Sequence, residues 1–218
     1  MSKTNIDWPG LTDVFNYISG CLHNCPGCYA ERFCHRFPKV WPKGFAPDIH
    51  PDRLNDPRLW NKKKHFTFFV CSMGDMFGEW VPAKWIETTL QACRDNPQHT
   101  YMFLTKNPKR YQVIDFLGID TWIGTSIDGR NQAVDEKRLY DLNKVRIIGK
   151  SRFRKFLSIE PLSGPITSLI DMIEYDLAIV GTMTGRKKVP PAAEWLDSLK
   201  IIPPEKLYFK ENIRGFIK

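Results

Sequence analysis

The alternation of short apolar blocks with helix-compatible stretches constrains the fold of this chain most. Blocks rich in β-branched, aromatic and other apolar residues occur at residues 66–71, 100–105, 121–126, 154–159, 177–180 and 207–209. Such blocks are typical of strands. Helical spacing is predicted between them, at residues 82–95, 108–117, 132–142, 166–173 and 192–199. This order of strands and helices indicates a parallel α/β fold.

The chain has 218 residues, of which 42% are hydrophobic, and this is enough for one sizeable core. The continuously apolar block 177–180 indicates a strand that is buried on both faces, as in a parallel sheet. A further strand is predicted at residues 15–19. A partial barrel and a doubly wound sheet both satisfy this pattern. We expect a single domain over residues 1–218, with a proline- and aromatic-rich insertion at about residues 31–64 that either covers the substrate or packs on itself.

Three cysteines follow the first predicted strand at C-x3-C-x2-C spacing, namely Cys21, Cys25 and Cys28. A cubane iron–sulfur cluster normally takes four thiolates, so a three-thiolate loop leaves one iron open to another ligand. A structural zinc site would need a fourth ligand from His23, Cys34 or His35. An electron carrier with a fully ligated cluster would use Cys34. A disulfide framework would suit a small secreted protein.

Charge and cysteine usage bear on partners and compartment. The formal net charge is +8 and the pI is near 9.2, which favours anionic partners. No apolar run approaches the roughly 20 residues of a membrane span. Six cysteines without an export signal predict a reducing compartment, so we expect a cytoplasmic protein.

The cysteine loop followed by Tyr29 resembles the cluster loop of the radical S-adenosylmethionine (radical SAM) superfamily. Further blocks resemble an uncharacterised, phage-associated radical-SAM-like protein family: residues 6–8, 19–21, 27–31, 50–54, 60, 69–77, 104–106, 122–126, 158–162 and 180–181. The resemblance implies a partial (β/α)6 TIM-like barrel of the radical SAM type. It also implies that Cys21, Cys25 and Cys28 hold a 4Fe-4S cluster whose open iron binds SAM.

Polar residues that follow the strands are the expected site residues, because the active site of a parallel barrel forms at the carboxyl ends of its strands. By the resemblance, the candidate cofactor-binding residues are Tyr29, Ser72, Gly74, Asp75, Thr105, Ser126, Asp128 and Thr184. The candidate catalytic residues are Lys106, Glu160 and Cys71. Each could instead cap a strand end or a helix, and Cys71 could simply fill the barrel.

The implied activity is that of an enzyme. An electron donor of flavodoxin or ferredoxin type would reduce the cluster. SAM would then be cleaved reductively to a 5′-deoxyadenosyl radical, which abstracts hydrogen from a substrate. Basic residues that follow strands, Lys106, Lys109, Arg110 and residues 186–188, predict a phosphate-bearing substrate, a nucleotide or nucleic acid. The alternative is a noncatalytic zinc or iron–sulfur nucleic-acid-binding protein, which would need Cys34 or a histidine as a further ligand.

Overall fold

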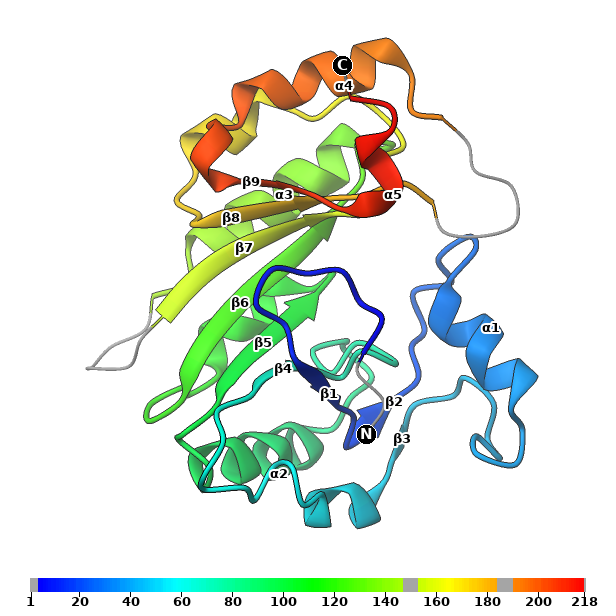
Figure 1. Cartoon of the computed structure of the whole chain (residues 1–218), viewed down its shortest axis with the longest axis vertical. Helices are drawn as coiled ribbons and strands as arrows, with labels where there is room; N and C mark the ends of the chain where they lie inside the picture. Colours follow the sequence, from blue (N-terminus) through cyan, green and yellow to red (C-terminus); the bar gives the residue numbers. More distant parts are fainter. Residues whose placement is uncertain (1–3, 147–152, 184–189, 218) are drawn as a thin grey trace.

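The computed structural model describes residues 4–146, 153–183 and 190–217. Its centre is one parallel sheet of seven strands in the order β1-β4-β5-β6-β7-β8-β9 (Figure 1). The strands are β1 (Asp13–Phe15), β4 (Thr67–Val70), β5 (Thr100–Thr105), β6 (Asp120–Ile127), β7 (Phe153–Ile159), β8 (Leu177–Val180) and β9 (Leu207–Phe209). The sheet curls without closing, since β1 and β9 remain its two edges. It is therefore the partial barrel that we predicted.

The sheet differs from the prediction at its first strand. It has seven strands, as the pattern of apolar blocks predicted, where the resemblance implies six. The predicted strand at residues 15–19 is two strands. Of these, β1 joins the sheet, and β2 (Ile18–Ser19) pairs in antiparallel fashion with β3 (Asp48–Ile49). The chain thus leaves the main sheet after Phe15, just before the cysteine loop.

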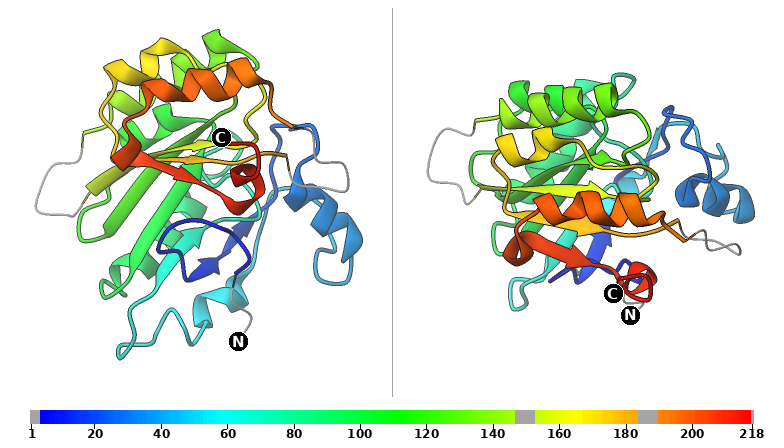
Figure 2. Two further views of the ribbon diagram at one scale, coloured as in Figure 1. Left: turned by 45° about the horizontal axis from the view of Figure 1, so that its top comes forward. Right: turned by 90° about the horizontal axis from the view of Figure 1, so that it is seen from above.

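Helices pack on the outer face of the sheet (Figure 2). The α-helices that follow strands are α2 (Ala83–Arg94), α3 (Gln132–Asn143), α4 (Ala193–Ser198) and α5 (Glu211–Arg214). The predicted helices at 108–117 and 166–173 are instead the short 3-10 helices η2 (Pro108–Val113) and η3 (Ser168–Met172). One inserted side chain fixes η2, because the buried Tyr111 hydroxyl lies 3.0 Å from the carbonyl oxygens of both Phe103 and Gly124.

The N-terminal segment crosses the concave face of the sheet (Figure 1). Its Trp8 ring lies among inward-facing side chains of four strands, with ring centroids 4.4 Å from Phe69 and 5.3 Å from Phe156. Met102 and Ile179 complete this inner cluster. The interior of the partial barrel is therefore packed, as in complete parallel barrels, and chemistry is left to the carboxyl edge.

The insertion contains most of α1 (Tyr29–Arg36), the strand β3 and the 3-10 helix η1 (Pro51–Asn55). The buried Trp41 packs with Ala30 and Cys34 of α1 and with Met73, which follows β4. The insertion is thus fastened to the sheet next to the cysteine loop. No helix in the described residues is long and apolar enough to cross a membrane.

Candidate functional site

Two glycines fasten the cysteine loop to the carboxyl edge of the sheet. The Gly20 amide donates to the carbonyl of Met73 at 2.9 Å, and Gly20 forms an isolated parallel bridge with Gly74. A Cβ on Gly74 would lie 2.4 Å from the Gly20 oxygen, so only glycine permits this approach. Gly20 itself has a positive φ of 83°. The loop thus leaves the sheet at a fixed point, and the contact of Gly74 with SAM stays a prediction.

The three cysteines of the loop carry free, partly exposed thiols. Burial raises the pKa of Cys21 to about 12, and the nearby charges of Asp75, Cys25 and Cys28 act in the same direction. A thiol in this setting binds metal only with loss of its proton. The helix α1 begins immediately after Cys28.

The donor set fits a cluster that is ligated by three thiolates. Cys34 is fully buried within α1 and packs on Trp41 and Met73, so it is a core residue of the helix. Among the described residues, no three His, Cys, Asp or Glu side chains lie close enough to hold one metal ion. In a cubane cluster each thiolate binds a different iron, and the three free thiols of this loop would supply three such ligands.

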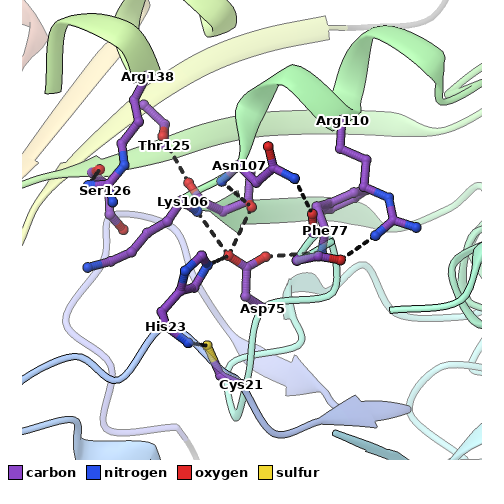
Figure 3. A network of polar contacts seen from close by, with 12 residues as sticks. Cys21, His23, Asp75, Phe77, Lys106, Asn107, Arg110, Thr125, Ser126 and Arg138 are labelled. Carbon is purple, nitrogen blue, oxygen red and sulfur yellow. Dashed lines mark hydrogen bonds and ion pairs between the residues drawn. The ribbon is translucent and has the colours of Figure 1, made fainter. Parts of the chain in front are cut away.

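Asp75 is the most connected side chain of the site (Figure 3). Its Oδ2 accepts hydrogen bonds from Thr105 Oγ1 at 2.9 Å and from the Lys106 amide at 2.9 Å, and it lies 2.8 Å from His23 Nε2. Its Oδ1 accepts from the Phe77 amide at 3.0 Å. The carboxylate is only 5% exposed. Asp75 therefore joins the ends of β4 and β5 to the cysteine loop.

His23 is the residue through which Asp75 reaches the loop, and we had considered it only as a zinc ligand. It lies between Cys21 and Cys25, and its ring meets Trp80 edge-on at 4.8 Å. Its amide hydrogen-bonds Cys21 Sγ at 3.5 Å. The position of His23 between two candidate cluster ligands could have drawn attention to it. Its partner Asp75 is 52 residues further along the chain, so the sequence did not predict the pair.

The structure brings the next predicted residues to the same edge. Thr105 accepts from the Asn107 amide in addition to its bond to Asp75. Only the backbone of Lys106 is engaged, and its ammonium has no hydrogen-bond or ion-pair partner in the part of the chain that the structure describes. Ser126 accepts through its carbonyl from Arg138 at 3.1 Å.

Asp128 and Glu160 each have a basic partner. Arg130 binds Asp128 through Nε at 3.0 Å and through a terminal nitrogen at 2.5 Å. Burial alone would raise the pKa of Asp128, but the hydrogen bonds from Arg130 lower it below its ordinary value. Glu160 accepts from Trp8 Nε1 at 3.0 Å and from Lys210 Nζ at 2.7 Å. Each carboxylate is thereby held in one orientation.

Three predicted residues hold the β4 end in place. Ser72 donates to the Asn16 side chain at 3.1 Å, and its carbonyl accepts from the Tyr29 hydroxyl. Burial raises the pKa of Tyr29 above its ordinary value. Cys71 is buried with a positive φ of 61°, and its thiol donates to the carbonyl of Ile18 at 3.2 Å. This environment suits a packing role for Cys71.

Arg110 and residues 186–188 belong to the basic residues that follow strands and that predict a phosphate-bearing substrate. Arg110 was expected to face an anionic substrate, but its guanidinium donates to the carbonyls of Gly78 and Val81. It therefore holds the loop between β4 and α2, because the turn leaves these carbonyls without strand partners. Thr184 and the basic residues 186–188 lie outside the described residues.

Solved structures with a similar fold are those of spore photoproduct lyase, a radical SAM enzyme. Its complex with dinucleoside spore photoproduct matches with a TM-score of 0.61 and 8% identity, covering 90% of this chain and 76% of the other. A cysteine-to-serine mutant matches with a TM-score of 0.62 and 9% identity, covering 96% and 80%. A double mutant with bound AdoMet and dinucleoside spore photoproduct matches with a TM-score of 0.50 and 11% identity, covering 89% and 62%. This likeness shows the fold.

The sequence comparisons give a family. No curated protein matches the chain. The model of the family described as "Protein of unknown function (DUF5131)" matches residues 3–205, which is most of the chain. The chain therefore belongs to the DUF5131 family, on a fold that it shares with the radical SAM enzyme spore photoproduct lyase.

Proposed function

We propose that this protein is a radical SAM enzyme that holds a 4Fe-4S cluster through Cys21, Cys25 and Cys28. The observation that supports this best is the place of three free thiols, on one loop at the carboxyl edge of a partial barrel. When bound, the cluster would supply the electron for reductive cleavage of SAM to a 5′-deoxyadenosyl radical. The chain's own part is to hold the loop, bind SAM and orient the substrate.

Asp75 holds the loop in this proposal. Its carboxylate already accepts from four groups, so we assign it a positioning role through His23 in place of the contact with the SAM amino group that the sequence suggested. The hydroxyl groups of Thr105 and Ser72 likewise donate their hydrogen bonds to other side chains of the protein. These residues shape the cofactor site through their backbone, as does Gly74.

The groups left for SAM and substrate lie further along the edge. The ammonium of Lys106 would pair with a carboxylate or phosphate. A ribose would hydrogen-bond through its hydroxyl groups to the Ser126 hydroxyl and to Asp128 and Glu160. The two carboxylates can still accept these bonds, because each has about four lone-pair sites and its present partners do not use all of them. We also retain Tyr29 and Thr184 as candidate SAM contacts and Cys71 as a candidate hydrogen donor.

A nucleotide or nucleic acid is the proposed substrate class. Spore photoproduct lyase, whose fold this chain shares, has been solved with a dinucleoside photoproduct bound. The net charge of +8 favours a polyanion, and the Lys106 ammonium lies at the carboxyl edge without a hydrogen-bond or ion-pair partner among the described residues. The charge and Lys106 support this class independently of the shared fold.

The test is anaerobic reconstitution with iron and sulfide, followed by addition of dithionite and SAM and chromatography for 5′-deoxyadenosine. Wild-type protein should form 5′-deoxyadenosine, and Cys25→Ala should form none. Cys34→Ala is the matched control, because Cys34 lies in the same segment but in the core of α1, and this variant should keep its iron and its activity. Loss of metal in Cys34→Ala, or tightly bound zinc in the wild type, would favour the noncatalytic metal protein instead.

A further inference from the structure

Exposed apolar side chains gather around the cysteine loop. Eleven large hydrophobic side chains are exposed among the described residues, and five of them fall between residues 22 and 40: Leu22, Tyr29, Phe33, Phe37 and Val40. Their exposed fractions run from 39% to 57%. The other six are spread over the rest of the described chain, from Trp60 to Met172, as is ordinary for surface residues. A concentration of this kind marks an interaction surface.

We call this region the α1 surface and define it by Leu22, Phe33, Arg36, Phe37, Lys39 and Val40. It is held in a fixed shape. Ala30 and Cys34 bury a neighbouring face of α1, the rings of Phe33 and Phe37 lie 4.7 Å apart, and the Arg36 guanidinium lies 5.4 Å from the Phe37 ring centre. A partner would thus meet a surface that is already ordered.

The α1 surface adjoins both ends of the cysteine loop. Leu22 follows Cys21, and α1 starts directly after Cys28, which occupies its N-cap position. A protein seated on this surface would therefore sit beside the three thiols. No other group of exposed apolar side chains in the described residues has this relation to the loop.

Charge and composition specify the partner. The α1 surface as defined carries two basic side chains, Arg36 and Lys39, and no acidic side chain. This favours an acidic partner. Leu22 and Val40 add aliphatic contacts to the aromatic ones, as in protein–protein interfaces, where aromatic residues and arginine are also enriched. A single-stranded nucleic acid would use aromatic stacking and cations, with no need for the aliphatic groups.

We propose that the α1 surface docks a small acidic electron-carrier protein of flavodoxin or ferredoxin type. This inference rests on the proposed function, because only a redox-active cluster needs such a partner. A carrier seated there would give up one electron and become oxidised, and a cluster held by Cys21, Cys25 and Cys28 would accept that electron. No covalent bond forms or breaks, and no proton moves.

The test uses two double variants of the full chain, Phe33→Ser with Phe37→Ser and Arg36→Glu with Lys39→Glu. Val113→Ser with Met172→Ser is the control, since these side chains are 82% and 77% exposed and do not belong to the α1 surface. Binding of an acidic flavodoxin to the cluster-free protein is measured at low and high salt. Cluster reduction is then followed in the reconstituted protein, either with flavodoxin, its reductase and NADPH or with dithionite.

We expect both surface variants to bind flavodoxin at least tenfold more weakly and to be reduced by it at least tenfold more slowly. Reduction by dithionite should be unchanged, and the control should match the wild type. High salt should weaken wild-type binding. Equal binding of flavodoxin by all variants, or equal reduction of all variants by it, would overturn the proposal. Failure of the wild type to cleave SAM with dithionite would instead count against the proposed function, while the binding data on the cluster-free protein would still decide the docking question.

Discussion

Asp75 and Glu160 both lie at the carboxyl edge of the sheet, after β4 and β7, but they accept hydrogen bonds from different kinds of donor. Asp75 accepts two backbone amides, one hydroxyl and a contact from the histidine of the cysteine loop. Among the described residues, Glu160 accepts only from side-chain donors, and these lie toward the two ends of the chain, Trp8 and Lys210. The first acid joins the cofactor loop to the strand ends. The second joins the chain termini across the concave face.

This difference separates two tasks. On the Asp75 side the chain satisfies its own polar groups, which fixes the loop before any cofactor binds. On the Glu160 side the contacts hold the N-terminal segment that fills the barrel, with Trp8 packed on Phe69 and Phe156. Damage to the first side should therefore show in metal content, and damage to the second should show mainly in stability.

The largest loss of bound iron is expected from Gly20→Ala. An added Cβ would lie 2.3 Å from the Ala46 oxygen, in a residue whose φ is +83°. Overpacking costs about 1–3 kcal/mol, and the left-handed conformation costs about 1–2 kcal/mol more. The free energy of unfolding, measured with denaturant, and the iron content after reconstitution should both fall sharply. Gly118→Ala is the control, because Gly118 has a similar φ of +81° and no atom within 4 Å of the added Cβ. Equal losses in the two variants would show that crowding at the loop is unimportant.

Asp75→Ala should follow, since it leaves several buried donors without an acceptor. Each unsatisfied group costs about 1–3 kcal/mol. We expect a lower unfolding free energy together with at least a twofold loss of bound iron. Glu160→Ala is the matched truncation on the other side. It should lower stability through Trp8 and Lys210 but leave the iron content at the wild-type level. Identical iron contents in the two variants would contradict the claim that Asp75 holds the cysteine loop and Glu160 does not.

Lys106→Ala should affect binding and leave folding alone. Its backbone amide, which the substitution keeps, makes the only hydrogen bond of this residue among those described, and its ammonium acts on Asp128 through its charge alone. The variant should unfold at the wild-type denaturant midpoint and bind SAM or a nucleotide about tenfold more weakly, which is about 1.4 kcal/mol. Equilibrium binding to the reconstituted protein measures this. A drop in stability with unchanged binding would assign Lys106 to the scaffold.

The smallest effect is a pH dependence at Asp7, which holds the N-terminal segment to the β9 edge. Burial would raise the pKa of Asp7, but the Tyr208 hydroxyl at 2.6 Å and the Glu211 amide at 2.6 Å outweigh it and lower the pKa. A lowered folded-state pKa contributes stability above the unfolded value of about 3.9 and loses it as the pH falls through the folded value.

The stability difference between wild type and Asp7→Asn should thus be constant from pH 7 to pH 5 and shrink at lower pH. Urea unfolding of both proteins over this range gives the measurement. A difference that grows on acidification would contradict the assigned direction.

The sequence predicted the strands well because their apolar character is local. The strands β5, β8 and β9 begin and end where the pattern placed them. The short helices η2 and η3 were not distinguished from α-helices, because a single inserted side chain such as Tyr111 leaves no periodic signal.

The site was predictable as a set of residues and not as a network. Strand-end rules brought Asp75, Thr105 and Lys106 to one edge, and the structure places them in contact. The pairing of His23 with Asp75 and of Trp8 with Glu160 spans 52 and 152 residues, respectively. Such pairings depend on the curled geometry of the sheet, which a local pattern does not encode.

The most direct test of the central claim is EPR spectroscopy of the reconstituted, reduced protein with and without SAM. The account predicts the signal of a reduced 4Fe-4S cluster that changes shape when SAM binds, with the change absent in Cys28→Ala. A cluster signal that is indifferent to SAM, or a protein that binds no iron, would contradict it.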